Sequence, residues 1–161
     1  MIVGIGVDLV DIPRFERTIS RTPRLLERLF SPNERLLKPH SLAARYAAKE
    51  ALIKALGGSD GVHWTEIEVA SEPSGRPVFS LTGSTAAVVA ARGITVVHLS
   101  MSHDAGLATA YVIAESVPAA QVSPRPGDPA ATEDGVRGLS PDASSRPTAP
   151  SRPPAAPEES A

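Results

Sequence analysis

The chain has 161 residues, a formal net charge of −2, 42% hydrophobic residues and no cysteine. This length predicts one domain with a buried core, and the lack of cysteine excludes disulfides and thiolate metal sites. The nearly neutral charge argues against general nucleic-acid binding. The sequence has no apolar run of about 18 residues and no signal-like N-terminus. We therefore expect a cytoplasmic protein that binds neither membrane nor nucleic acid.

The composition changes at Val117. Residues 117–161 contain ten of the sixteen prolines and no aromatic residue. A segment of this composition cannot bury enough apolar surface to offset the entropy lost on ordering. We predict a folded domain over residues 1–116 and a disordered tail, rich in Pro, Ala and Ser, over residues 117–161.

A β-strand is predicted at residues 2–10, because its side chains alternate between an apolar face and a face of small residues. The second face carries Gly4, Gly6 and Asp8. Two glycines on one face leave room for another backbone or a ligand to approach closely. Asp11, with Pro13 after it, is the expected N-cap of the next helix. Asp8 then has no capping role and is a candidate functional residue.

A helical segment is predicted over residues 13–28, with a break at Thr22-Pro23. Its arginines are spaced three and four residues apart, which aligns them along one side: Arg14, Arg17, Arg21, Arg24 and Arg28. A solvated helix face and a docking face for an acidic partner both fit this pattern. Nearby apolar residues that could anchor such a partner are Phe15, Leu25, Leu26 and Leu29.

A central helix is predicted to span residues 45–57 and to end at Gly57. Glu50 lies on its small, apolar face, with Tyr46 among the neighbours within about 60°. One interpretation is a structural ion pair between Glu50 and Lys54, which are four residues apart. The other is a carboxylate that ligates a cation, with Arg45, Lys49 and Lys54 beside it for a polyanion. Glu50 alone does not decide between them.

The remaining elements indicate an α+β fold. Ser31 and Glu34 form a capping-box pattern for a short helix that Pro39 would end, and Ser41 is a candidate cap for the central helix. Strands are expected at 65–69, 77–81, 94–102 and 107–114, with a helix at 84–92 and a hairpin at 103–106. His103 fits either a surface position or, together with Ser100 and Ser102, a phosphate site.

Five stretches together resemble the short, single-repeat class of 4′-phosphopantetheinyl transferases, the holo-acyl-carrier-protein synthases. They occur in the family's order, at residues 4–10, 30–34, 45–57, 75–77 and 99–104. The resemblance covers residues 1–116 and implies an antiparallel sheet packed against a long central helix, assembled as a homotrimer. The segment between Glu34 and Arg45 is shorter than is usual in the family, and the tail is atypical.

The resemblance also implies an activity and a site. The enzyme would transfer the 4′-phosphopantetheine arm of coenzyme A to a serine of apo-acyl carrier protein, release adenosine 3′,5′-bisphosphate and serve fatty acid biosynthesis. Asp8 and Glu50 would ligate Mg²⁺, and Lys54 would act with them in catalysis. The other implied roles are coenzyme A binding by Arg45, Lys54, Gly57, Arg76, Pro77 and His103, and carrier-protein docking by Arg14, Arg21 and Arg24.

Two rival functions also have to be compared with the residues present. A binding module without turnover would be expected to have lost a metal ligand, and both carboxylates are present. A Mg²⁺-dependent hydrolase of coenzyme A or another nucleotide diphosphate could also use Asp8, Glu50 and Lys54, with water in place of serine. The arginine face argues against the hydrolase, because hydrolysis needs no acidic protein partner.

Overall fold

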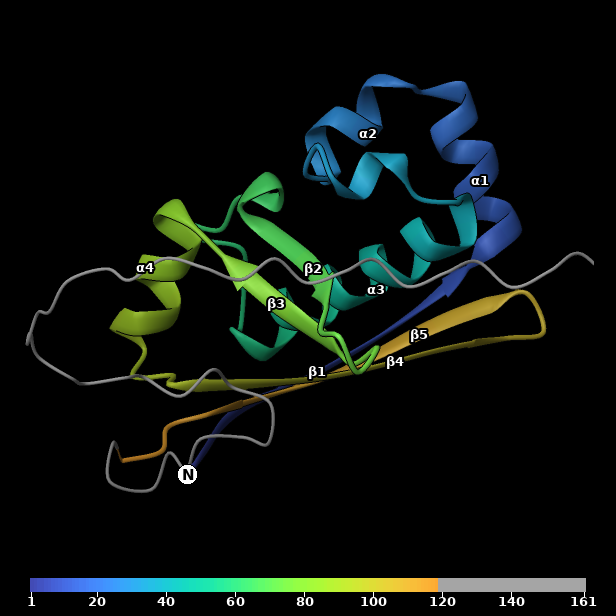
Figure 1. Ribbon diagram of the computed structural model, residues 1–161. Helices are drawn as coiled ribbons and strands as arrows, with labels where there is room; N and C mark the ends of the chain where they lie inside the picture. The colour runs from blue at the N-terminus through green and yellow to red at the C-terminus, as the bar shows by residue number, and fades with distance from the viewer. Residues whose placement is uncertain (119–161) are drawn as a thin grey trace, which may run out of the picture. The chain divides into compact units, whose positions relative to one another are not determined.

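A computed structural model describes residues 1–118, so all but the first two residues of the predicted tail lie outside the described part. The fold is α+β, as expected (Figure 1). No helix in the described part is long and apolar enough to cross a membrane. The strands are β1 (Ile2–Asp11), β2 (Ile67–Ser71), β3 (Pro77–Leu81), β4 (Val96–Asp104) and β5 (Leu107–Glu115). The helices are α1 (Ile12–Arg21), α2 (Arg24–Leu29), α3 (Pro39–Ala55) and α4 (Gly83–Ala91), with 3₁₀ turns η1 (Glu34–Leu36) and η2 (Trp64–Glu66).

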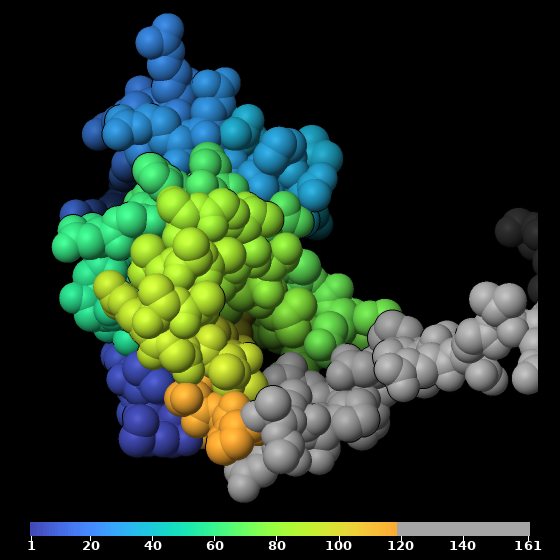
Figure 2. Space-filling view, turned by 90° about the vertical axis from the view of Figure 1, so that its left-hand side faces the viewer, coloured from blue at the N-terminus to red at the C-terminus, as the bar shows by residue number. Residues whose placement is uncertain are grey.

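The main sheet has three antiparallel strands in the order β1-β5-β4. The predicted hairpin joins β4 to β5 through Ala105 and Gly106, whose φ angles are 48° and 78°. Two successive positive φ angles match a type I′ turn, whose twist suits a two-residue hairpin. The start of β1 and the end of β5 lie side by side, and the Met1 amino group there donates to the Ser116 carbonyl. Figure 2 shows these two ends together at the base of the molecule.

Helix α3 lies across the inner face of this sheet, and its contact with β1 depends on the two strand glycines. A Cβ atom at Gly4 would overlap the carbonyl oxygen of Ala55, and one at Gly6 would overlap that of Ala51. The predicted close approach of another backbone is therefore confirmed, and the approaching backbone is that of α3. The sheet also offers small buried residues to the helix from β5: Ala108, Ala110, Val112 and Ala114.

The apolar face of β1 points away from α3 and is exposed. Ile5 and Leu9 are each 63% exposed, and Tyr111 and Ile113 of β5 lie on the same outer face. Apolar residues normally turn inward, so this arrangement reverses the usual pattern of a half-buried strand. The small side chains face the core because the helix backbone occupies the space that larger ones would need.

The second sheet is the β2–β3 hairpin, in which Ile67 and Val69 are buried. Glu66, directly before β2, caps the first turn of α4. Its Oε2 accepts hydrogen bonds from Thr85 N at 2.8 Å, Thr85 Oγ1 at 2.9 Å and Ser84 Oγ at 3.0 Å. These bonds lower the pKa of Glu66 to about 2, first because the Thr85 backbone N–H stabilises the carboxylate.

The segment between α2 and α3 differs from the prediction. The capping box forms, with Ser31 N donating to Glu34 Oε2 and Glu34 N donating to Ser31 Oγ. The helix after it is only the 3₁₀ turn η1, and Pro39 begins α3 rather than ending a helix. Proline is favoured in the first helical turn because its missing N–H would have no partner there. Ser41 is therefore inside α3 and is not its cap.

Lys49 and Glu34 form a buried ion pair between α3 and η1, with 2.7 Å between Lys49 Nζ and Glu34 Oε2. Lys49 Nζ also donates to the carbonyls of Leu29 at 2.7 Å and Trp64 at 3.2 Å. Glu34 Oε1 accepts from Val69 N. Burial lowers the pKa of Lys49, and its pairing with Glu34 opposes that shift. Lys49 is therefore buried and links α3 to the segments that carry Leu29, Glu34 and Trp64. The hypothesis that Lys49, next to Glu50, helps to bind a polyanion is wrong.

Candidate active site

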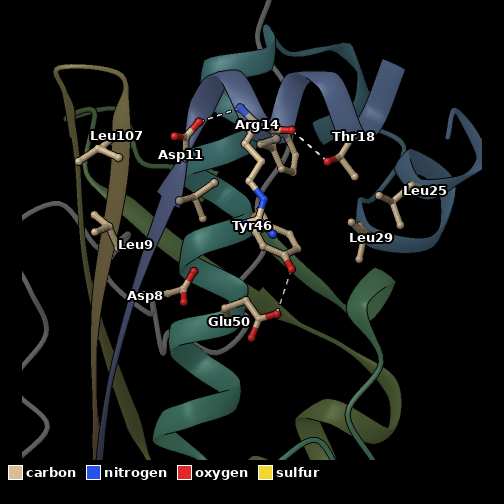
Figure 3. A pocket seen from close by; sticks show the side chains of 12 residues that line it. Asp8, Leu9, Asp11, Arg14, Thr18, Leu25, Leu29, Tyr46, Glu50 and Leu107 are labelled. Carbon is tan, nitrogen blue, oxygen red and sulfur yellow. Dashed lines mark hydrogen bonds between the residues drawn. The ribbon is translucent and has the colours of Figure 1, made fainter. Parts of the chain in front are cut away.

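A cleft of about 660 Å³ opens where β1, α1, α2 and α3 come together (Figure 3). Asp8 and Glu50 line it from β1 and α3, respectively. Its other walls are largely apolar and include Leu9, Val10, Phe15, Leu25, Leu29 and Leu107. Phe15, Leu25 and Leu29, which were predicted as possible anchors for a partner, all line this cleft.

Asp8 reaches the cleft because it follows the two glycines on the inner face of β1. Its Oδ1 lies 2.7 Å from Lys54 Nζ, which also donates to the Val7 carbonyl at 3.0 Å. The hydrogen bond from Lys54 to Asp8 raises the pKa of Lys54. Lys54 is 52% exposed, and Asp8 is 15% exposed. A cationic side chain is therefore fixed at the solvent-facing edge of the carboxylate.

Glu50 lies one helical turn before Lys54 on α3, yet its hydrogen bond comes from a different residue. The hydroxyl of Tyr46 donates to Glu50 Oε1 at 3.1 Å. The described residues contain no ion pair between Glu50 and Lys54, because Lys54 is turned toward Asp8. The interpretation of Glu50 and Lys54 as a structural pair is therefore wrong, and Glu50 is left facing the cleft.

Tyr46 also lines the cleft, and no role for it was predicted from the sequence. Its ring is stacked on Trp64, with 5.4 Å between centroids and 13° between planes, and it lies 5.5 Å from the ring of Phe15. Burial, and then the charge and hydrogen bond of Glu50, raise the pKa of Tyr46 to about 12. The four-residue spacing from Glu50 was the signal that could have identified it.

The three arginines of the predicted docking face are all exposed, but they do not lie in one place. Arg14 extends from α1 into the cleft toward Tyr46 (Figure 3). Its backbone N–H donates to Asp11 Oδ1 at 2.7 Å, which confirms Asp11 as the N-cap of α1. Arg21 ends α1 and Arg24 begins α2, so both lie on the surface beyond the cleft.

None of the residues predicted to bind coenzyme A is among those that line the cleft of this chain, although Lys54 contacts Asp8 at its edge. Arg45 is turned toward β2, where its Nε donates to the Val69 carbonyl at 3.2 Å. Gly57 follows the end of α3 with φ 75°, as the predicted left-handed cap. Arg76 and Pro77 lie at the β2–β3 turn. His103 lies near the β4–β5 turn, with its ring 5.7 Å from that of His40.

The donor set of the cleft fits Mg²⁺. The described residues contain no cluster of three or more His, Cys, Asp or Glu side chains that could enclose a metal ion. Mg²⁺ does not require one, because it commonly takes one or two protein carboxylates and fills its shell with water and substrate phosphate oxygens. Asp8 and Glu50 supply two carboxylates on one cleft. With Lys54 beside Asp8, this donor set suits a divalent cation and a phosphate group.

Comparison with known proteins places this fold and cleft in a family. The chain belongs to the 4′-phosphopantetheinyl transferase superfamily, whose family model matches residues 4–112. It is 61% identical over 115 residues to a holo-[acyl-carrier-protein] synthase of Clavibacter sepedonicus, an alignment that covers 71% of this chain and 97% of that one. A synthase of the same name from Leifsonia xyli subsp. xyli is 56% identical over 71% of this chain and 98% of its own.

Solved structures agree with the sequence comparison. The holo-[acyl-carrier-protein] synthase of Neisseria meningitidis matches with a TM-score of 0.67 and 33% identity, over 71% of this chain and 99% of that one. The enzyme of Helicobacter pylori, solved in complex with coenzyme A, matches with a TM-score of 0.63 and 34% identity, over 69% and 99% of the two chains. The resemblance found in the sequence motifs, and the fold that it implied, are confirmed.

Proposed function

We propose that this protein transfers the 4′-phosphopantetheine arm of coenzyme A to a serine hydroxyl of apo-acyl carrier protein, with Mg²⁺ as cofactor. The observation that carries the proposal is that Asp8 and Glu50 line one cleft, with Lys54 hydrogen-bonded to Asp8, in a member of this superfamily. The bond from the serine oxygen to phosphorus forms as the diphosphate bond breaks. Adenosine 3′,5′-bisphosphate leaves with the electron pair of that bond, and the serine proton is released, in net, to solvent.

In this mechanism the chain's own residues hold the metal ion and place positive charge next to the diphosphate. Asp8 and Glu50 would hold Mg²⁺, which when bound neutralises the diphosphate and the negative charge that grows on the leaving phosphate. Lys54 adds a second positive charge at the edge of Asp8, within reach of a phosphate that enters from solvent. Once the substrates fill the cleft, its apolar walls would help to exclude water, which favours attack by serine over hydrolysis.

The arginines are proposed to dock the carrier protein. Arg21 and Arg24 are exposed at the end of α1 and the start of α2, next to the cleft wall formed by Leu25 and Leu29. Exposed arginines attract and orient an acidic helix through charge, which mainly raises the rate of encounter. Arg14, inside the cleft, is placed to act closer to the reacting serine.

We further propose that the enzyme is a homotrimer whose subunits meet at the outer face of the main sheet. That face exposes Ile5, Val7 and Leu9 at alternate positions of β1, with Ile113 of β5 opposite Ile5, and contiguous apolar surface of this kind commonly marks a protein interface. Arg45, Arg76 and His103 lie outside the cleft of their own chain, so their proposed contacts to coenzyme A would be made at a site shared with a neighbour. Sedimentation equilibrium would test the trimer, and Ile5→Glu, on the same outer face but not in the cleft wall, should favour monomers.

The decisive experiment is incubation of the full chain with coenzyme A, Mg²⁺ and apo-acyl carrier protein, followed by intact-mass measurement of the carrier protein. The expected result is the mass increase of one phosphopantetheine group, lost on chelation of Mg²⁺ and in Asp8→Ala or Glu50→Gln. Release of adenosine 3′,5′-bisphosphate without carrier protein would instead indicate the hydrolase. Carrier proteins of fatty-acid and polyketide synthesis, supplied in parallel, would test the proposed role in cytoplasmic fatty acid biosynthesis.

A further inference from the structure

We propose that Tyr46 is a positioning residue for Glu50: its hydroxyl fixes the carboxylate through Oε1 and leaves Oε2 for the cation. The inference rests on the proposed function, because it takes Glu50 as a ligand of Mg²⁺. Residues that hydrogen-bond a metal ligand commonly fix its orientation and thereby its affinity for the metal. Nothing in the cleft other than Tyr46 donates to Glu50 among the residues described.

The geometry suits this role because both residues lie on α3, four positions apart. Side chains at this spacing are neighbours on the helix surface, so the 3.1 Å bond needs no distortion of the backbone. Glu50 has a long side chain with several rotatable bonds, and an unrestrained carboxylate loses that freedom when it binds a cation. A hydrogen bond made before the cation arrives removes part of that cost.

The donor is also chemically suitable. A phenol hydroxyl is a neutral donor, so it orients the carboxylate without bringing a positive charge that would compete with Mg²⁺. The contrast is with Asp8, which is held by the ammonium of Lys54 at 2.7 Å. Asp8 and Glu50 are thus oriented by different means: Glu50 by a neutral hydroxyl and Asp8 by a cation.

The tyrosine hydroxyl is held in place by its ring. The ring is stacked on Trp64 at 5.4 Å and packed against Phe15 at 5.5 Å. With one aromatic ring from η2 and another from α1 against it, the side chain of Tyr46 is restrained in both of its torsion angles. A restrained ring points its hydroxyl in one direction, toward Glu50.

Trp64, on which the ring of Tyr46 is stacked, is itself hydrogen-bonded to α3, the helix that carries Tyr46. Lys49 Nζ donates to the backbone carbonyl of Trp64 at 3.2 Å and is itself paired with Glu34. Lys49 precedes Glu50 directly in α3. The segment that carries Trp64 is therefore fixed to the helix that carries both Tyr46 and Glu50, and a movement of α3 carries the tyrosine, its support and the carboxylate together.

The test is direct measurement of cation binding, with Mn²⁺ as the probe and its electron paramagnetic resonance signal as the readout. The full chain is titrated with Mn²⁺ in the presence of coenzyme A and without carrier protein, so that no turnover occurs. Tyr46→Phe keeps the ring and removes the hydroxyl. We expect Mn²⁺ binding to weaken by about 10-fold, while the affinity for coenzyme A without metal and the melting temperature stay close to those of the wild type.

Two further variants test the proposed coupling. Ser41→Ala removes a hydroxyl from α3 away from Glu50 and should leave Mn²⁺ binding unchanged. Glu50→Asp shortens the carboxylate so that the hydroxyl cannot reach it. In that background, Tyr46→Phe should have little further effect on Mn²⁺ binding, because the two residues are no longer joined.

The outcomes separate the inference from the proposed function. Unchanged Mn²⁺ binding in Tyr46→Phe would overturn the positioning role while leaving the metal site intact. A loss of the same size in the Glu50→Asp background would also overturn it, since Tyr46 would then act through general packing. If the wild-type chain with coenzyme A bound no Mn²⁺, the proposed metal site would fail first, and the inference with it.

Discussion

Lys54 Nζ lies 2.7 Å from Asp8 Oδ1, although the two residues are 46 positions apart in the sequence. The pair joins the end of α3 to the inner face of β1 at the edge of the cleft. Glu50, the nearer acidic residue along the helix, is bonded to Tyr46 instead. Lys54 is therefore held against Asp8 and not against Glu50. A phosphate bound at the mouth of the cleft would lie close to both the proposed Mg²⁺ and the Lys54 ammonium group.

Replacement of Lys54 by Met is expected to separate catalysis from stability. Transfer should fall by about 100-fold or more, because a positive charge aimed at the developing negative charge is lost. The free energy of unfolding should change by less than about 1 kcal/mol, since ion pairs at exposed positions contribute little. The measurements are kcat at saturating coenzyme A and a urea unfolding curve. Arg92→Met, at the exposed end of α4, is the matched control, and a stability loss as large as the activity loss would contradict a catalytic role.

Replacement of Lys49 by Met should have the opposite effect. Lys49 is fully buried, so its removal leaves the Glu34 carboxylate unpaired in the interior and should cost about 3–5 kcal/mol of unfolding free energy. Adding Glu34→Gln should recover part of that loss, because the amide oxygen still accepts from Val69 N without a buried charge. Urea unfolding of the single and double variants measures the coupling. A cost below about 1 kcal/mol for Lys49→Met would show that the pair is dispensable.

The pH dependence of stability should reveal the cap formed by Glu66. Its folded-state pKa of about 2 lies below the ordinary value of 4.5. The ionised carboxylate therefore contributes stability that is present above pH 4.5 and is lost as the pH falls toward 2. Glu66→Gln should be less stable than the wild type at neutral pH, and the difference should shrink across that window. Melting temperatures at a series of pH values measure it, with exposed Glu27→Gln as the control. A constant difference at all pH values would contradict the assignment.

Charge reversal at Arg21 or Arg24 should change the KM for the carrier protein and leave the KM for coenzyme A nearly unchanged. Arg21→Glu or Arg24→Glu is expected to raise the KM for acyl carrier protein by about 2- to 5-fold, a range typical of exposed charge contacts. The dependence of that KM on salt should also weaken, because long-range attraction between exposed charges is screened by ions. The KM for coenzyme A should hardly move, whereas Arg14→Glu, inside the cleft, should affect both substrates.

Steady-state kinetics for both substrates at low and high salt test this prediction. Arg92→Glu provides the same change of charge on α4, far from the proposed docking face, and should leave the KM for the carrier protein unchanged. If Arg21→Glu weakened coenzyme A more than the carrier protein, the arginines would belong to the nucleotide site and the docking proposal would fail.

The sequence was informative where local patterns decide the structure. Alternation along β1 predicted which residues share a face with Asp8, and the two glycines predicted the close approach of a second backbone. Gly57 and Asp11 were predicted as helix caps for reasons of local geometry. In each case a residue and its near neighbours along the chain contain the physical cause.

The choice of partner across the fold could not be predicted in the same way. Lys54 pairs with Asp8 rather than Glu50, and Lys49 pairs with Glu34, because the tertiary arrangement brings those groups together. Local spacing favoured Glu50 as the partner of Lys54 and indicated no partner for Lys49. Pro39 shows a similar limit: proline ends one helix as readily as it begins another, and only the path of the chain after η1 distinguishes the two.

The contact of β1 with α3 through Gly4 and Gly6 has a consequence for how the site tolerates change. Asp8 and Glu50 are carried by two backbones that touch each other directly, so peptide groups, rather than the sizes of core side chains, set the spacing between the two carboxylates. Substitutions elsewhere in the core can alter stability without moving one carboxylate relative to the other. The chain can therefore accumulate mutations around its centre while the part that does the chemistry keeps its dimensions.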